Sequence, residues 1–355
     1  MIGSTKEAKL NFKLLREIGK EGKNSEVFLA YDLQLDGNIA VKRIPIKKFK
    51  DVDNYFDEAK KLYDSSHPNV VQVKYSCQDE EHVYLAMPFY VNGSLNQLIN
   101  QRYLTTGEII KFSLDFLSGL HHIHTKKLIH FDIKPNNVLL SNSMDGLLSD
   151  FGLAKYIDAY GTAEPDNLYN AQIPPECYLT NRFTVHTDIY QVGVTLYRLC
   201  NGNNEFYSQR NIFRNEDGTF NYDRFKRAVI SGRYPDRGTF LPHIPNKLKT
   251  IIRKAMKPNP KERYNTVLEM MNELASIDKK LHWQYVQHEE AMEWTIEFDT
   301  KCESLRLISR NETYEVLGEK LIRSTARRTR ISDWSKKNLD KQSALDFVTE
   351  ILDIY

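Results

Sequence analysis

One short string most limits what this chain can fold into. Residues 130–137 read His-Phe-Asp-Ile-Lys-Pro-Asn-Asn, and Asp-Phe-Gly follows at 150–152. Phosphoryl transfer needs metal ligands, a group that orients the attacking hydroxyl, and a cation that neutralises charge in the transition state. The string offers these chemical types in four side chains: Asp132, Lys134, Asn137 and Asp150. Either half alone would be a weak signal, but their order and spacing predict a phosphoryl-transfer site.

Further short motifs flank this string in a fixed order. Upstream lie the strand-like Ile39-Ala40-Val41-Lys42 and, on a helix expected over 53–65, Glu58. Downstream lie Pro174-Pro175-Glu176, Asp188 in an apolar helix expected over 188–200, and Arg263. With these motifs in this order, the sequence resembles the eukaryotic-type protein kinase family over roughly residues 12–277. The resemblance implies that Asp188 is buried and that Arg263 pairs with Glu176.

The resemblance also implies an α+β protein with the bilobal kinase fold. Short β-like runs dominate up to about residue 89, and helical spacing dominates from about residue 94, most clearly over 106–125. We therefore expect a small β-rich N-lobe over residues 10–90 and a larger helical C-lobe over 91–280. Residues 281–355 contain all three tryptophans and resemble no family known to us. They are expected to form a small C-terminal α/β accessory domain of unknown function, with a strand over 304–310 and a helix over 343–355.

Roles for the motif residues follow from the resemblance alone. Asp132 would accept or orient the proton of the substrate hydroxyl, and Lys134 would neutralise charge on the transferred phosphoryl group. Asn137 and Asp150 would hold Mg²⁺. Lys42, tethered by Glu58, would position the phosphates of ATP. His130 is interpreted as structural, packing near Phe151 and Asp188.

The resemblance places ATP between the two lobes. Its adenine would be packed by Val27, Ala40 and Leu139, with Met87 as gatekeeper and Phe89 in the hinge. The phosphates would lie under a glycine-rich loop that contains Gly19 and Gly22, but this loop departs from the family pattern. It has one extra residue between the first two glycines, and Ser25 replaces the third. Since glycine lets backbone N–H groups approach phosphate, we expect weakened nucleotide binding rather than inactivity.

Phe131 occupies the position before Asp132 where most switchable kinases carry arginine. That arginine normally pairs with a phosphate on the activation segment. We therefore expect activity that does not depend on phosphorylation of Tyr160, Thr162 or Tyr169. The Lys134-Pro135 pair is Ser/Thr-kinase-like, although Tyr169 lies near the place where such kinases usually carry threonine, so dual specificity stays open.

Charge and cysteine content bear on partners and on location. Lys and Arg number 49 against 47 Asp and Glu, a net charge of +2, which argues against capture of nucleic acid or an anionic membrane by the whole chain. Four scattered cysteines indicate neither a disulfide framework nor a zinc site, and no apolar run is long enough to span a membrane. We expect a cytoplasmic protein with a protein substrate and no membrane association.

Two features stay open at this level. A basic run over 320–337 contains seven Lys or Arg and a single acid, Asp333. It fits a solvated face better than a site for nucleic acid or a phosphate-bearing partner. Residues 281–355 could also serve self-association or docking of a partner.

Two alternatives to an active protein kinase share part of these features. A pseudokinase scaffold that binds nucleotide and presents its C-terminal domain to a partner has the altered glycine loop as its one support. A small-molecule kinase of the aminoglycoside or choline type shares the pattern His-x-Asp with a later Asn. Against it stand Lys134-Pro135, the Pro-Pro-Glu string and Arg263.

Overall fold

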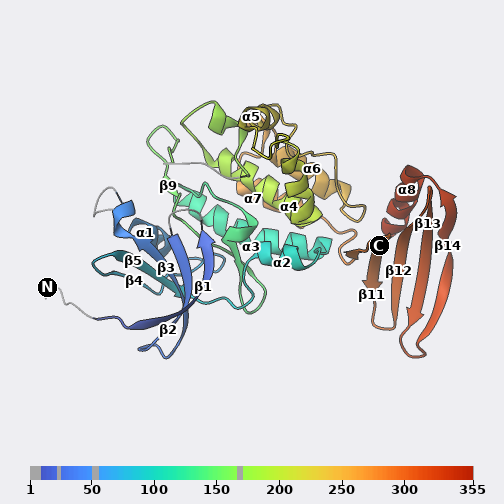
Figure 1. Ribbon diagram of the computed structural model, residues 1–355, viewed down its shortest axis with the longest axis horizontal. Helices are drawn as coiled ribbons and strands as arrows, with labels where there is room; N and C mark the ends of the chain where they lie inside the picture. Colours follow the sequence, from blue (N-terminus) through green and yellow to red (C-terminus); the bar gives the residue numbers. More distant parts are fainter. Residues whose placement is uncertain (1–8, 22–24, 50–55, 166–170, 355) are drawn as a thin grey trace.

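The computed structural model describes residues 9–21, 25–49, 56–165 and 171–354 (Figure 1). Its first unit is a five-stranded antiparallel sheet in the spatial order β1-β2-β3-β5-β4. The strands are Phe12–Glu21, Ser25–Asp32, Gly37–Pro45, His82–Pro88 and Tyr75–Gln78 in that order. Helix α1 (Asp57–Asp64) accompanies the sheet and buries Ala59 and Leu62. The helix expected over 53–65 corresponds to α1, which begins after its N-cap residue Phe56 and ends at Asp64; residues 53–55 lie outside the described part.

The second unit is mainly helical. Its helices are α2 (Leu95–Gln101), α3 (Thr106–Thr125), α4 (Val185–Asn211), α5 (Tyr222–Ile230), α6 (Asn246–Ala255) and α7 (Val267–Ala275). Helix α3 has the expected bounds, because Thr105 and Glu108 form a capping box at its start. Helix α4 begins at Val185, before the expected 188, and is interrupted by a kink at Gly202, where φ is 77°; a second helical segment then continues to Asn211.

Two short strand pairs hold the loops that carry the phosphoryl-transfer string. Strand β6 (Leu128–Ile129) pairs with β9 (Lys155–Tyr156), and β7 (Val138–Leu140) pairs with β8 (Gly146–Leu148). The segment 130–137 thus runs from β6 to β7, and Asp150-Phe151-Gly152 runs from β8 to β9. Because each pair fixes both of its strands, the two halves of the string are held side by side.

The C-terminal unit is an antiparallel meander with one helix. Strands β10 (Gln284–Gln287), β11 (Ala291–Glu297), β12 (Lys301–Arg310), β13 (Thr313–Ile322) and β14 (Arg327–Leu339) pair in sequence order. Helix α8 (Lys341–Leu352) lies across one face, where it buries Val348 and Leu352 against a core that includes all three tryptophans (Figure 1). The strand expected over 304–310 lies inside β12, and the expected terminal helix is α8. In the described part of the chain, none of the helices has both the length and the apolar character that crossing a membrane requires.

The C-terminal unit is anchored on the loop before α3 and on the segment before α6. The Trp294 indole N–H donates to His243 Nδ1 at 3.2 Å, and the rings of Tyr103 and Tyr285 meet edge to face with centroids 4.7 Å apart. Gly107 N–H donates to the Leu281 carbonyl at 2.8 Å, and a Cβ on Gly107 would lie 3.0 Å from that oxygen. These contacts fix where the strands begin relative to the helical unit.

His243 makes this anchorage sensitive to pH. Burial lowers the pKa of His243 to about 3, and the nearby Lys280 and Lys249 ammonium groups act in the same direction. In the unfolded chain the pKa returns to about 6.5, so between these values only the unfolded state takes up the proton. We expect the free energy of unfolding to be highest above pH 7 and to fall by up to about 1.4 kcal/mol per pH unit below 6.5 from this group.

Urea titrations between pH 5 and pH 7.5 measure this effect. The matched variant is His243→Asn, whose side-chain oxygen can still accept from Trp294 but does not titrate. The difference between the wild type and the variant should shrink as the pH falls. A difference that is constant across the range would contradict the assignment.

Candidate active site

The first cluster of the site joins the N-terminal sheet to the segment after β8. Lys42 lies on β3 and is 5% exposed. Its ammonium donates to both Glu58 carboxylate oxygens, at 2.8 and 2.9 Å, and to Asp150 Oδ1 at 2.8 Å. A Cβ on Gly152 would lie 3.3 Å from Asp150 Oδ1, so a residue with a side chain at this position would crowd the cluster. The expected tether between Lys42 and Glu58 is present.

In this cluster the Lys42 ammonium is shared between two carboxylates, those of Glu58 and Asp150. Burial raises the pKa of the Glu58 carboxyl, and the Asp150 carboxylate acts in the same direction, while the Lys42 ammonium opposes both. A further cation beside Asp150 would relieve the excess negative charge. The arrangement is therefore suited to a metal ion or to a polar ligand that brings one.

The second cluster lies in the loop between β6 and β7. Lys134 Nζ donates to Asp132 Oδ2 at 2.7 Å. The Asn137 amide donates to the same oxygen and to the Asp132 carbonyl, both at 2.9 Å. Asn137 is on a 3-10 turn started by Pro135, which turns the chain back toward Asp132. A carboxylate, an ammonium and an amide thus meet within one turn of chain.

Asn137 offers a direct test of whether a cation fits here. Its amide nitrogen is fully used, but its Oδ1 is buried and accepts no hydrogen bond from the described residues. A buried acceptor without a donor is costly unless a ligand completes it. Mg²⁺ prefers oxygen ligands, and Asp150 follows Ser149, whose N–H donates to the Asn137 carbonyl at 2.9 Å. The donor set fits a magnesium ion held by Asn137 and Asp150.

Asp188, at the start of α4, holds the backbone of the loop between β6 and β7 in place by hydrogen bonds. It is fully buried, and its carboxylate accepts from His130 N–H at 2.9 Å and from Phe131 N–H at 2.8 Å. Its Oδ2 also lies 2.8 Å from His124 Nε2. These bonds hold Phe131 at a φ of 68°, an unusual value for a residue with a side chain. The expected burial of Asp188 is confirmed.

His130 connects the two halves of the string. One ring nitrogen, Nε2, lies 3.0 Å from the Ser149 carbonyl, and the other, Nδ1, accepts from Asp132 N–H at 3.2 Å. These partners require a neutral ring protonated on Nε2, and burial lowers the pKa of His130 accordingly. Its ring packs edge to face on Phe151 at 5.0 Å. The structural interpretation of His130 is confirmed.

Phe131 helps to hold the activation segment by apolar contact. Its fully buried side chain shares a cluster with Ile129, Ala163 and Phe183, and the rings of Phe131 and Phe183 are 6.0 Å apart. Ala163 and Phe183 also pair as an isolated β-bridge. Hydrophobic burial therefore packs Phe131, next to Asp132, against the segment around Ala163 and Phe183.

Thr162 lies in a turn that is closed by the Asp158 carboxylate. Its hydroxyl and its N–H both donate to the Asp158 carboxylate, at 3.0 and 2.9 Å, and Tyr160 N–H adds a third bond at 2.9 Å. Phosphate on Thr162 would face that carboxylate and disrupt the turn. Tyr169, the third residue considered from sequence, lies outside the described residues.

We expect Tyr160→Phe and Thr162→Ala to change the rate of phosphoryl transfer by no more than about twofold, because neither side chain touches the two clusters. Initial rates at saturating nucleotide measure this. Near-complete loss of activity in either variant would show that the apolar cluster is not sufficient to order the segment.

The residues expected around adenine lie on four strands. Ala40 on β3 is in register with Leu29 on β2 and with Met87 on β5, and Val27 is in register with Lys42. Leu139 lies on β7 and forms an isolated bridge with Ser94. Phe89 follows β5 and is half-buried. Gly19 is on β1 opposite Val27, whereas Gly22 lies outside the described residues.

Sequence reasoning missed the polar side chains that support the catalytic loop. Gln191 accepts from Ile133 N–H at 3.0 Å and donates to the Phe131 carbonyl at 2.8 Å. Gln172 donates to the Ile133 carbonyl at 3.1 Å and accepts from Arg198 at 2.6 Å. Gln191 and Arg198 are the polar interruptions of an otherwise apolar helix, and that interruption was the available signal. The three histidines near the end of α3 form no metal cluster among the described residues.

Comparison with known proteins agrees with this geometry. Residues 12–275 match the family model described as the protein kinase domain. The chain is 27% identical over 279 residues to a probable serine/threonine-protein kinase PknB of Lactococcus lactis, covering 76% of this chain and 43% of that protein. It is 28% identical to serine/threonine-protein kinase Nek5 of Mus musculus over 71% of this chain and 38% of that protein. Against PrkC of Bacillus subtilis the identity is 24%, over 73% and 39%. The chain thus spans less than half the length of these relatives.

Proposed function

This chain belongs to the protein kinase family, and on that premise we propose that it transfers the γ-phosphoryl group of ATP to Ser or Thr hydroxyls of proteins, itself included. The observation that carries the proposal is a pair of polar clusters whose loops are joined by the hydrogen bond from Ser149 N–H to the Asn137 carbonyl. One is Lys42 with Glu58 and Asp150, and the other is Asp132 with Lys134 and Asn137. Residues 10–90 and 91–280 would be the lobes that bring them together, with 281–355 as an accessory domain.

Each cluster has its own task in this proposal. Lys42, held by Glu58, would bind the α- and β-phosphates and so align the γ-phosphoryl group. Asp132 would orient the substrate hydroxyl and accept its proton, since its Oδ2 is fixed by two donors. Lys134 is 26% exposed at its side chain and can leave Asp132 to meet the transferred phosphoryl oxygens.

Magnesium would be held by Asn137 Oδ1 and Asp150. When bound, Mg²⁺ would neutralise the charge that develops on the phosphates of ATP during transfer. The chain's own contribution is to present a buried amide oxygen and a carboxylate on two loops that Ser149 ties together.

Substrate preference follows from the loop and from the relatives. Lys134-Pro135 is Ser/Thr-kinase-like, and the relatives named above are described as serine/threonine-protein kinases. Transfer to tyrosine is a second outcome that phosphoamino-acid analysis of the products would detect.

A transfer assay with radiolabelled γ-phosphate tests the proposal. The wild-type chain, ATP, Mg²⁺ and a generic protein mixture should give labelled protein, and EDTA or Asp150→Asn should remove the label. The control variant is Ser143→Ala, in the exposed turn between β7 and β8. Gly161→Ala would be a poor control, because the φ of 78° at Gly161 is unfavourable for a residue with a side chain. Nucleotide binding without transfer by the wild type would favour a pseudokinase scaffold and overturn the proposal.

A further inference from the structure

The structure divides the basic run over 320–337 into neutralised and unpaired cations. Arg323 pairs with Glu297 at 2.6 Å and Lys337 with Glu315 at 3.3 Å, while Lys336 lies over the Phe347 ring at 3.9 Å. In contrast, no carboxylate of the described residues lies within ion-pair distance of Arg328 or Arg330. The basic run is therefore not equivalent along its length, and two arginines without an ion pair to a described residue, Arg328 and Arg330, lie near the start of β14.

Strand register brings these arginines onto one face with other polar groups. Across β11 to β14, one row contains Thr295, Ser304, Glu319 and Arg330, each in register with the next. The neighbouring row contains Cys302, Leu321 and Arg328. Because side chains alternate along a strand, both rows lie on the face opposite the core residues Trp294, Leu305 and Val316 that pack with α8.

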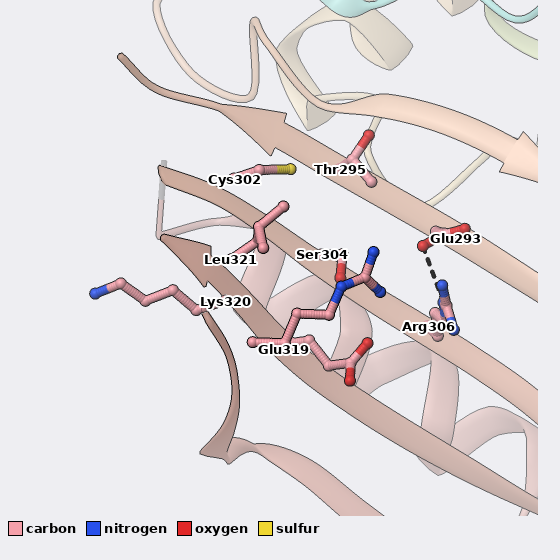
Figure 2. A pocket seen from close by; sticks show the side chains of 9 residues that line it. Glu293, Thr295, Cys302, Ser304, Arg306, Glu319, Lys320 and Leu321 are labelled. Atoms are coloured by element: carbon pink, nitrogen blue, oxygen red, sulfur yellow. Dashed lines mark hydrogen bonds and ion pairs between the residues drawn. The ribbon is translucent and has the colours of Figure 1, made fainter. Parts of the chain in front are cut away.

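This face is hollowed where the rows meet. A cavity of about 130 Å³ is lined by Glu293, Thr295, Cys302, Ser304, Arg306, Glu319, Lys320, Leu321 and Arg328 (Figure 2). Small-molecule sites usually measure about 300–1,000 Å³. The hollow is therefore of a size to receive one functional group of a larger partner.

Several hydrogen-bond donors in the hollow have no partner among the described residues. The hydroxyls of Thr295 and Ser304 form no hydrogen bond with other described residues, and the Arg328 guanidinium has no acid partner there. Arg306 donates through its Nε to Glu293 at 2.9 Å, and the Glu319 carboxylate also acts on its charge. In the lining as a whole, three cations, Arg306, Lys320 and Arg328, outnumber two carboxylates, Glu293 and Glu319. This excess of positive charge and of free donors favours a ligand that accepts hydrogen bonds and carries negative charge.

We propose that this hollow docks a phosphorylated side chain of a protein segment. A phosphate monoester has three acceptor oxygens and a charge near −2, which matches two hydroxyls and two guanidinium groups better than a carboxylate does. A nucleic acid fits less well, because residues 281–355 contain more Asp and Glu than Lys and Arg and would repel an extended polyanion. The site goes beyond the proposed activity and can be tested without any catalysis.

Fluorescence anisotropy with the full chain is the test. The probes are a degenerate phosphoserine peptide library, the same library without phosphate, inorganic phosphate as competitor, and a single-stranded DNA of mixed sequence. We expect the phosphorylated library to bind at least about tenfold tighter than the unphosphorylated one, and Arg328→Gln or Ser304→Ala to remove most of that difference. The matched control is Arg310→Gln, which removes one positive charge from the same sheet. Arg310 lies outside the hollow and pairs with Glu315 at 3.5 Å.

The outcomes separate the proposal from its rivals. Equal binding of both libraries, tighter binding of DNA, or inorganic phosphate binding as tightly as the phosphopeptides would each overturn it. Melting temperatures of the variants should stay within a few degrees of the wild type, because all three side chains lie on a solvated face. Unchanged phosphopeptide binding by a folded Arg328→Gln variant would also overturn it, and none of these readouts depends on phosphoryl transfer.

Discussion

Replacing Asp132 by alanine should lower the rate of phosphoryl transfer by about 10²–10⁴-fold, the range associated with loss of a positioned acid or base. The carboxylate is 9% exposed at its side chain and is fixed by Lys134 and Asn137 at 2.7 and 2.9 Å. Its removal leaves no group in that position to orient the attacking hydroxyl. Single-turnover rates with saturating ATP and Mg²⁺ measure the loss.

The same variant should bind nucleotide as the wild type does. Lys42 is held by its own hydrogen bonds to Glu58 and to Asp150, and none of these three bonds is made by Asp132. The effect is therefore expected in kcat rather than in the KM for ATP. Asn136→Ala is the matched control, since Asn136 is exposed in the same loop and its side chain has no part in the proposed chemistry. A variant that keeps more than about a tenth of wild-type activity would show that Asp132 does not have this role.

Local motifs made much of the site predictable from the sequence. Residues 130–137 are contiguous, so the meeting of Asp132, Lys134 and Asn137 requires only a single turn of chain. Helix α3 was predictable for a similar reason, because its period and its capping box are both local. The contact between Lys42 and Glu58 is not local and was expected from the resemblance alone.

The backbone conformation of the site and its long-range polar contacts could not be predicted from local motifs. Phe131 and Asp150 have φ values of 68° and 61°, which their own side chains disfavour. For Phe131, the compensation is the Asp188 carboxylate, 57 residues further along the chain. Arg198 is fully buried among amide oxygens of Asn96, Gln172 and Asn203, a set that only the packed helices bring together. Such contacts depend on tertiary structure rather than on spacing.

The C-terminal sheet shows a second limit. One strand was expected where the structure has five, because the fit of a strand depends on its cross-strand neighbours more than on its own residues. Gly318 illustrates this point. A Cβ at Gly318 would lie 2.3 Å from Trp334 Cβ, so glycine is what lets β14 carry its tryptophan into the core. A single glycine in the sequence of a strand does not indicate which side chain of the neighbouring strand, here Trp334, will pack against it.

Replacing Arg263 by methionine should lower the free energy of unfolding by about 3–5 kcal/mol, as for other buried pairs that lose one member. Arg263 and Glu176 are 3% and 7% exposed. The guanidinium donates to both Glu176 oxygens, at 2.8 and 2.7 Å, and to the carbonyls of Lys257, His186 and Pro258. All five N–H groups are therefore used, and the variant would leave a buried carboxylate without its cation.

A double-mutant cycle makes this prediction specific to the pair. Glu176→Gln combined with Arg263→Met should be less destabilising than the sum of the two single variants, because the second change removes the stranded charge. Arg263→Lys should restore only part of the loss, since an ammonium group has three donors and cannot match the planar fork. Urea unfolding followed by circular dichroism measures the wild type and all four variants. Additive effects within about 0.5 kcal/mol would mean that Arg263 acts through its carbonyl contacts rather than through Glu176.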